Sequence, residues 1–247
     1  MTGVGVNFPE VNDAIGKYWQ AEWGKPPYRI MDASQLVPHG PVDVVANGLD
    51  FAVFTGHKMW ADPGIGILWG KKELLKSMEP CIGGGGAINF VHTDGYEVSG
   101  LPYRFEPGTP NLTGAVSLLT AVEYFESVGG YPEVAETERE LVEYALEEFA
   151  ERSETVTLVG PTVAVLPSGA IRAGVFSFTV EGKHVTDVAD AFAAEDVCVR
   201  AGHHCAEPFH IRQEISGTVR MSISMYTTQD DLEKFFEVLD DIVRKPR

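Results

Sequence analysis

The sequence predicts an α/β fold built from two parts, and three observations support this. Up to about residue 125, short β-prone runs alternate with helical segments, the order typical of an α/β domain. From about residue 131, short strands gather between charged or amphipathic helices, as in an α+β domain. The 247 residues, 44% of them hydrophobic, suffice for one large or two smaller cores. We therefore expect a large domain at residues 1–128 and a small α+β domain at residues 129–247.

The first part is predicted to hold three strands between helices. Ile15, Trp19 and Trp23 lie on one stripe of a helix over residues 10–23, which Pro26 and Pro27 end. The expected strands are "YRIM", which leads to Asp32, then "FAVFTG" and "IGILWG". A short helix "KKELLKSM", a loop over residues 80–100 and the helix "TGAVSLLTAVEYFESVGG" complete this part. Three strands are few for such a sheet, so we expect further strands before Met1 in the intact fold.

The second part begins with the charged helix "PEVAETERELVEYALEEFAER". Short strands are expected around "VTLVG", "VAVL" and "AGVFSFTV", followed by a helix at residues 184–194. The sequence then predicts a strand "VCVR", a loop at 201–217, a strand "VRMSISM" and the amphipathic helix "TQDDLEKFFEVLDDIVRK". These elements predict helices packed over a small sheet.

Composition excludes several classes of function. The formal net charge of −17 argues against nucleic acid as a partner, because phosphate binding requires basic surface. No apolar run approaches the roughly 20 residues that span a bilayer, and no signal peptide is visible, so we expect a cytoplasmic protein. Three cysteines without a CxxC pair favour neither a disulfide framework nor a zinc site, and we expect no metal. Cys81 and Cys198 are expected to be buried, the common state of free cysteines.

Lys58 is the first candidate for chemistry, because it directly follows a β-prone run in "FAVFTGHKMW". A lysine at a strand end is most often a surface residue with a buried stem. Here Gly56 permits close backbone approach, and Asp32 ends the preceding strand. Ligands of open α/β sheets bind beyond the carboxyl ends of strands. A lysine and an aspartate together there suit pyridoxal 5'-phosphate, with the lysine bonded to the cofactor and the aspartate paired with its pyridine nitrogen.

Cys205 and Arg220 are the second pair of candidates. Cys205 lies in the loop "RAGHHCAEPF", where Arg200 and His204 supply positive charge that favours a reactive thiolate. Arg220 lies in "GTVRMSISMY", where apolar alternation points inward or towards a cleft. A guanidinium in that place is suited to gripping a carboxylate with two hydrogen bonds.

These segments together resemble a known family. The runs "DASQ", "DFAVFTGHKMW", "GIGILWGKKELL", "GGGG", "YRFEPGTPN", "VRAGHHCAEP" and "VRMSISMYTT" agree in type, order and spacing with cysteine desulfurases of the class V aminotransferase family. The selenocysteine lyase-like branch is the most similar. The resemblance covers about residues 2–243. It implies the C-terminal portion of the large domain of the fold type I PLP-dependent transferases, followed by a small domain that carries the catalytic cysteine.

The resemblance also implies a role for each candidate residue. Lys58 would bind the cofactor covalently and act as catalytic base, and Cys205 would be the nucleophile. Cofactor contacts would come from Asp32, Gln35, Thr55 and His57, and from Thr109 across a homodimer. Substrate contacts would come from Arg220, Arg200 and His204.

The implied reaction converts L-cysteine to L-alanine with a persulfide on Cys205, for transfer to a sulfur-acceptor protein in iron–sulfur cluster assembly. Selenocysteine lyase, cysteine sulfinate desulfinase and another class V reaction remain alternatives. Members of the family are longer at the N-terminus, where further cofactor contacts lie. The resemblance therefore leaves open an inactive chain, or one that needs a partner chain supplying the first half.

Overall fold

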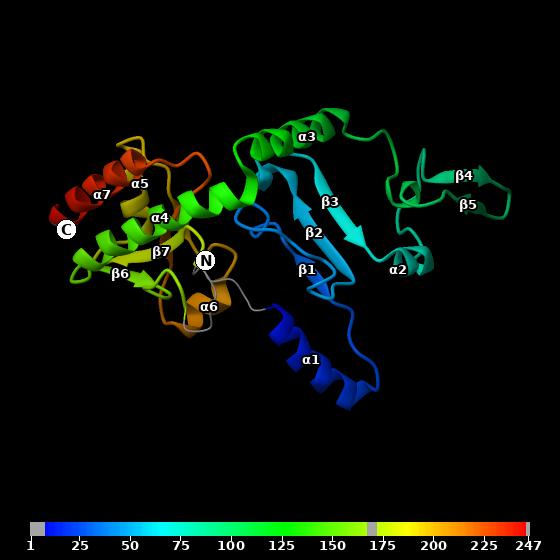
Figure 1. Ribbon diagram of the computed structural model, residues 1–247, viewed down its shortest axis with the longest axis horizontal. Helices are drawn as coiled ribbons and strands as arrows, with labels where there is room; N and C mark the ends of the chain where they lie inside the picture. The colour runs from blue at the N-terminus through cyan, green and yellow to red at the C-terminus, as the bar shows by residue number, and fades with distance from the viewer. Residues whose placement is uncertain (1–7, 167–171, 246–247) are drawn as a thin grey trace. The chain divides into compact units, whose positions relative to one another are not determined.

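The computed structural model describes residues 8–166 and 172–245 (Figure 1). The chain forms two compact units, one at Phe8–Gly130 and one that includes Tyr131–Arg247. Each unit has its own sheet, so each is described by itself.

The first unit is built on a three-stranded sheet in the order β1-β2-β3. Strand β1 (Ile30–Asp32) runs parallel to β2 (Phe51–Thr55), and β2 pairs antiparallel with β3 (Gly66–Gly70). These are the three predicted strands. Helix α1 (Phe8–Trp23) precedes the sheet and starts two residues before the predicted helix. The short η1 (Gly56–Met59) follows β2, and α2 (Lys72–Ser77) follows β3.

The predicted loop at residues 80–100 is wrong in part, because it contains a β-hairpin. Strands β4 (Ile88–Val91) and β5 (Tyr96–Val98) pair antiparallel and form a separate two-stranded sheet (Figure 1). Phe90 and Val91 are exposed, so this hairpin has no buried face to produce the alternation that predicts a strand. A short turn η2 (Tyr103–Phe105) and helix α3 (Leu112–Ser127) follow.

The second unit has a four-stranded antiparallel sheet in the order β6-β7-β9-β8. The strands are β6 (Val156–Val159), β7 (Val175–Val180), β8 (Arg200–Gly202) and β9 (Thr218–Ser222). Four helices accompany them: α4 (Gly130–Glu151), α5 (Val185–Ala193), α6 (Glu207–Arg212) and α7 (Gln229–Arg244) (Figure 1).

Three predictions for the second unit are wrong. "VAVL" forms only a single bridge at Val165. Of "VCVR" only Arg200 belongs to a strand, because Val197 and Val199 pack against the core without pairing in the sheet. The predicted loop at 201–217 contains α6, whose Pro208 lies in its first turn, the helix position where proline is best tolerated.

The core of the second unit is dense and aromatic. Phe149 of α4 lies against the rings of Phe176 and Phe178, and also against those of Phe235 and Phe236 of α7. All five rings are almost completely buried. Such a cluster supplies most of the apolar burial that holds a domain together.

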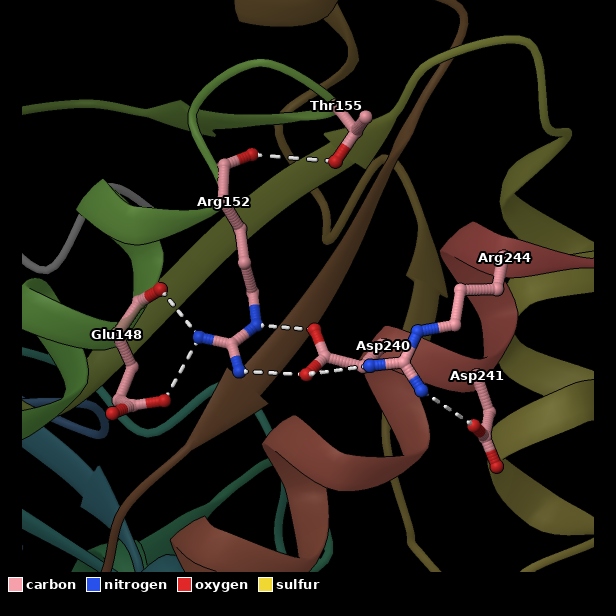
Figure 2. Close-up of polar contacts among 6 residues, drawn as sticks. All are labelled: Glu148, Arg152, Thr155, Asp240, Asp241 and Arg244. Carbon is pink, nitrogen blue, oxygen red and sulfur yellow. Dashed lines mark hydrogen bonds and ion pairs between the residues drawn. The ribbon is translucent and has the colours of Figure 1, made fainter.

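An ion-pair cluster ties the end of α4 to α7, as Figure 2 shows. The Arg152 guanidinium donates to both carboxylate oxygens of Asp240, with Nε–Oδ1 at 2.7 Å and Nη2–Oδ2 at 3.0 Å. It also donates to the backbone and the carboxylate of Glu148, and it covers the Phe236 ring at 5.0 Å. This bidentate arrangement orients one helix against the other.

Candidate functional site

The first group of candidate residues lies where β1 and β2 end. The parallel register places Asp32 opposite Val53, and the Ala33 N–H continues the ladder by donating to the Val53 carbonyl at 2.8 Å. Lys58 follows β2 within η1. Because the carboxyl ends of parallel strands share one sheet edge, Asp32 and Lys58 come to the same place. The Lys58 ammonium accordingly contributes to lowering the pKa of Asp32.

Asp32 is held as a carboxylate chiefly by Ser34. The Ser34 hydroxyl and its backbone N–H, at 2.9 Å from Asp32 Oδ1, lower the pKa of Asp32 below its usual range. Lys58 adds to this effect, and partial burial opposes it. Sequence reasoning missed Ser34, although the spacing Asp-x-Ser is the pattern of an Asx turn. The arrangement gives an exposed carboxylate that stays ionised and can accept a hydrogen bond from the N–H of a protonated ring nitrogen.

The turn that carries Lys58 is fixed on both sides. The Thr55 hydroxyl lies 2.8 Å from His57 Nδ1. A Cβ on Gly56 would lie 2.4 Å from Ile65 Cγ2, so only glycine allows this close approach. After the turn, the Trp60 ring stacks on Phe125 of α3 at 5.3 Å. Lys58 is half-buried and His57 exposed, so the turn presents both amine and imidazole at a rigid edge.

Gln35 and Thr109 are both exposed. Gln35 lies in the turn just after Asp32, which keeps it at the same sheet edge. Thr109 precedes α3, in a segment that Asn111 orders. The Asn111 amide donates to the Gly64 carbonyl at 3.0 Å, and its oxygen accepts from the Gly114 N–H at 2.9 Å. Asn111 thus caps α3 and links it to the loop before β3.

The second group of candidates lies on β8, β9 and the turn after β8. Arg200 and Arg220 are directly paired across the two strands. Burial and the Arg200 charge lower the pKa of the half-buried Arg220 guanidinium, and the Cys205 thiol partly offsets this lowering. Two guanidinium groups and one thiol therefore share a single electrostatic environment, which suits an anionic substrate group and a thiolate.

Cys205 itself is exposed, at the tip of the turn between β8 and α6. Its backbone and that of His204 have positive φ angles of 60° and 52°. The prediction that Cys81 and Cys198 are buried is wrong, since both thiols are exposed as well. Each lies in irregular backbone at the surface rather than in a core strand. Exposure therefore does not distinguish Cys205, whereas its proximity to Arg220 does.

His204 is the neutral member of this group. Burial, and then the Arg220 charge, lower its pKa to about 4. Its Nε2 lies 3.0 Å from the Thr218 carbonyl and 2.9 Å from the Thr218 hydroxyl. His210, which sequence reasoning did not select, contacts the same hydroxyl at 3.1 Å. Only the register of β9 reveals this link, so no local pattern could have predicted it.

Two further searches concern only the described residues, 8–166 and 172–245. Among them, no group of three or more His, Cys, Asp or Glu side chains is arranged to hold a metal ion. Within the same ranges, no helix has the length and apolar character needed to cross a membrane.

Comparisons with known proteins identify the family. The model of the aminotransferase class-V family matches residues 25–235, so the chain belongs to that family. A probable cysteine desulfurase from Halalkalibacterium halodurans is 38% identical over 211 residues, which are 85% of this chain and 50% of that protein.

Solved structures give the same result for the fold. The apo structure of a cysteine desulfurase from Thermococcus onnurineus NA1 matches with a TM-score of 0.86 and 35% identity, over 98% of this chain and 57% of that one. The cysteine desulfurase CsdA from Escherichia coli matches with a TM-score of 0.80 and 28% identity, over 91% and 53%. The fold is therefore the fold type I of PLP-dependent enzymes. The chain spans about half the length of these relatives.

Proposed function

We propose that this chain carries the catalytic lysine and the catalytic cysteine of a PLP-dependent cysteine desulfurase in the cytoplasm. The reaction converts L-cysteine to L-alanine and leaves a persulfide on Cys205. The observation that supports it best is the pairing of Lys58 with an ionised Asp32 at the ends of two parallel strands. The cysteine, kept beside Arg220 in the second unit, supports sulfur chemistry over simple transamination.

The residues at the sheet edge fit pyridoxal 5'-phosphate. Lys58 supplies the amine for its carbonyl carbon, and Asp32 supplies a carboxylate for its pyridine nitrogen. Gln35 is assigned to the ring hydroxyl, and Thr55 and His57 to the phosphate. Exposed Thr109 is assigned to the phosphate held by a second copy in a homodimer. When bound, the cofactor supplies an electron sink for negative charge at the substrate α-carbon.

The protein groups then divide the chemistry. Arg220 binds the substrate carboxylate, with Arg200 and His204 shaping the site around it, and the Lys58 amine takes the α-proton. The Cys205 thiolate attacks the substrate sulfur, forming an S–S bond. The electron pair of the substrate C–S bond passes to the β-carbon, which is protonated, and return of the α-proton from Lys58 completes alanine. The sulfur is oxidised and the carbon reduced, so no external oxidant is needed. A thiol of an acceptor protein then takes the persulfide sulfur, which we place in iron–sulfur cluster assembly.

The exposed apolar faces of the first unit support a need for the other half of the family's polypeptide. Leu112, Val116 and Leu119 lie on one face of α3 and are all more than half exposed. On α1, Ile15 and Trp23 are also exposed. Contiguous apolar surface of this kind marks an interface. We therefore propose that activity requires a segment equivalent to the N-terminal half of the relatives, in the same assembly.

The test compares the purified chain alone with the chain co-expressed with the N-terminal half of the Halalkalibacterium halodurans relative. Pyridoxal phosphate is added, and the visible absorbance and a borohydride-stable mass increase on the Lys58 peptide are measured. We expect both signals in the complemented sample, and their loss in Lys58→Ala but not in the surface control Lys76→Ala. A complemented, folded sample that shows neither signal would refute cofactor binding.

The second readout is product formation from L-cysteine. We expect alanine and a persulfide in equal amounts, abolished by Cys205→Ala and retained by Cys198→Ser, whose thiol is equally exposed. If sulfur release survives Cys205→Ala, the assigned nucleophile is wrong. Turnover of selenocysteine or cysteine sulfinate well above that of cysteine would replace desulfurase with one of the alternative reactions.

A further inference from the structure

The turn that presents Cys205 has an unfavourable backbone conformation. His204 and Cys205 are adjacent non-glycine residues with left-handed φ angles, and Gly202, two residues before His204, has a φ of 115°. Such conformations persist only where the surrounding structure holds them. The contacts that hold this turn therefore determine where the Cys205 thiol lies.

Three hydrogen bonds hold the turn from outside Cys205. The Ala206 N–H donates to the His203 carbonyl at 2.8 Å and closes the turn. His203 Nε2 lies 3.0 Å from the Ser216 carbonyl, and His204 Nε2 lies 3.0 Å from the Thr218 carbonyl. Both rings thereby fasten the turn to the strand β9 side of the sheet, whose residue Arg220 lies close to the thiol.

The hydrogen-bond partners of the His204 and His210 rings determine which nitrogen of each ring carries a proton. A carbonyl oxygen only accepts, so His204 donates from Nε2 to Thr218, and His210 donates from Nδ1 to the Ala206 carbonyl at 3.0 Å. A neutral His210 must then accept at Nε2, where the Thr218 hydroxyl lies at 3.1 Å. The Thr218 hydroxyl thus donates to His210 while facing the N–H of His204 at 2.9 Å. Thr218 and His210 are completely buried.

These hydrogen-bond directions leave a lone pair, and no proton, on His204 Nδ1. That atom is buried and has no hydrogen-bond partner among the described residues. The groups that act on the ring are Arg220 from β9, Arg200 from β8 and His210 from α6. Burial, and then the Arg220 charge, lower the pKa of His204 to about 4, so the ring stays neutral beside the thiol.

We propose that Thr218 and His210 are positioning residues for Cys205: their hydrogen-bond relay to His204 holds the left-handed turn and fixes His204 as the Nε2–H tautomer. The inference rests on the proposed function, in which Cys205 is the nucleophile. Neither residue touches the reacting atoms, and both act through His204. The relay thus makes the buried hydroxyl of β9 a determinant of thiol reactivity.

The first test needs neither cofactor nor turnover. In Cys81→Ser/Cys198→Ser protein, Cys205 is the one remaining thiol of three, and its alkylation rate by iodoacetamide is followed from pH 5 to 9. We expect Thr218→Val to change the rate by about tenfold, the effect of one lost buried hydrogen bond, and to displace the pH profile. Thr218→Ser, which keeps the hydroxyl, should restore both. A folded Thr218→Val protein with the wild-type rate and profile would overturn the relay.

The second test keeps the proposal falsifiable if Thr218→Val does not fold. In the unsubstituted chain with 15N-labelled histidine, two-bond proton–nitrogen spectra report each tautomer, with His204→Gln and His210→Gln giving the assignments. We expect Nε2–H for His204 and Nδ1–H for His210 at neutral pH. The opposite tautomer in either ring contradicts the relay. Because neither test uses desulfurase activity, failure of the relay and failure of the proposed function are told apart.

Discussion

The two units differ in how many of their large apolar side chains are exposed to solvent. In the second unit, one cluster gathers Phe149, Phe176, Phe178 and the apolar face of α7 into a core. Among the described residues, the large hydrophobic side chains that are exposed lie almost all in the first unit; the second has only Val163, Val165, Ile211 and Tyr226. In the first unit they include residues along α1, β3 and α3, such as Trp23, Leu68 and Leu119.

This difference shows which parts of the fold are self-sufficient. The second unit buries its aromatic residues against its own sheet, so its stability comes from its own core. The first unit has an ordered site at its sheet edge but leaves apolar faces uncovered, which is costly for an isolated domain. The relatives are about twice as long as this chain, and we propose that a segment equivalent to their N-terminal half covers these faces.

The largest expected effect is on the aromatic core of the second unit. Phe149→Ala should lower the free energy of unfolding by about 3–5 kcal/mol, because it leaves a cavity among four other rings. The matched control is Phe90→Ala on the exposed hairpin, expected to change it by less than about 0.5 kcal/mol. Hydrogen exchange with mass spectrometry locates the effect in one unit.

All four tryptophans lie in the first unit, at positions 19, 23, 60 and 69. Their fluorescence therefore follows that unit during urea unfolding, while circular dichroism follows both. We expect Phe149→Ala to leave the fluorescence transition unchanged. A parallel shift of both signals would show that the two units unfold together. It would contradict the conclusion that the second unit is stabilised by its own core.

The next effect concerns the cluster shown in Figure 2. Arg152→Met should destabilise the second unit by about 1.5–3 kcal/mol, because a charge-assisted bidentate pair is lost and Asp240 is left partly buried. Arg139→Met is the control, since the ion pairs of Arg139 among the described residues are with exposed glutamates of its own helix, where solvent screening leaves such pairs little effect on stability. Equal effects in urea unfolding would count against a special role for the α4–α7 pair.

Each unit has a helix whose N-cap residue can be replaced with alanine, so the same kind of substitution can be compared in both. Asn111 caps α3 and Thr228 caps α7 with a capping box, so replacing either with alanine should cost about 1 kcal/mol. Asn111→Ala should shift the tryptophan fluorescence transition. Thr228→Ala should shift the circular dichroism transition and leave the fluorescence transition unchanged. If Asn111→Ala has no effect on fluorescence, the link from α3 to the loop at Gly64 does not stabilise the first unit.

The elements that could be predicted from the sequence are those whose apolar residues are buried in the structure, or whose ends are marked by residues that start or stop a helix or strand. β1, β2 and β3 were predicted from short apolar runs, and α7 from a stripe that the structure buries. The β4–β5 hairpin escaped because its residues are exposed and lack alternation. "VCVR" misled because Val197 and Val199 are packed as irregular backbone, where burial resembles a strand pattern without its hydrogen bonds.

For the candidate site, residues carried by local sequence were predictable and those joined by topology were not. Lys58, Asp32 and Cys205 stand in distinctive short segments. Their assigned roles stay predictions, although the structure groups Lys58 with Asp32 and Cys205 with Arg220. His210 and Thr218 belong to the Cys205 turn only through the register of β9 and the placement of α6, which no sequence spacing specifies.

The last expected effect is a pH dependence of the second unit. The folded pKa of His204 is lowered to about 4, below its ordinary value near 6.5, so between these values the unfolded chain binds more protons. Stability should therefore fall as the pH decreases from about 6.5 towards 4, and the contribution of His204 should be complete above 6.5. In His204→Gln, urea midpoints by circular dichroism should depend less on pH over this range, whereas the fluorescence transition should not respond. An equal slope with and without His204 would mean that carboxylates alone set the acid sensitivity of this unit.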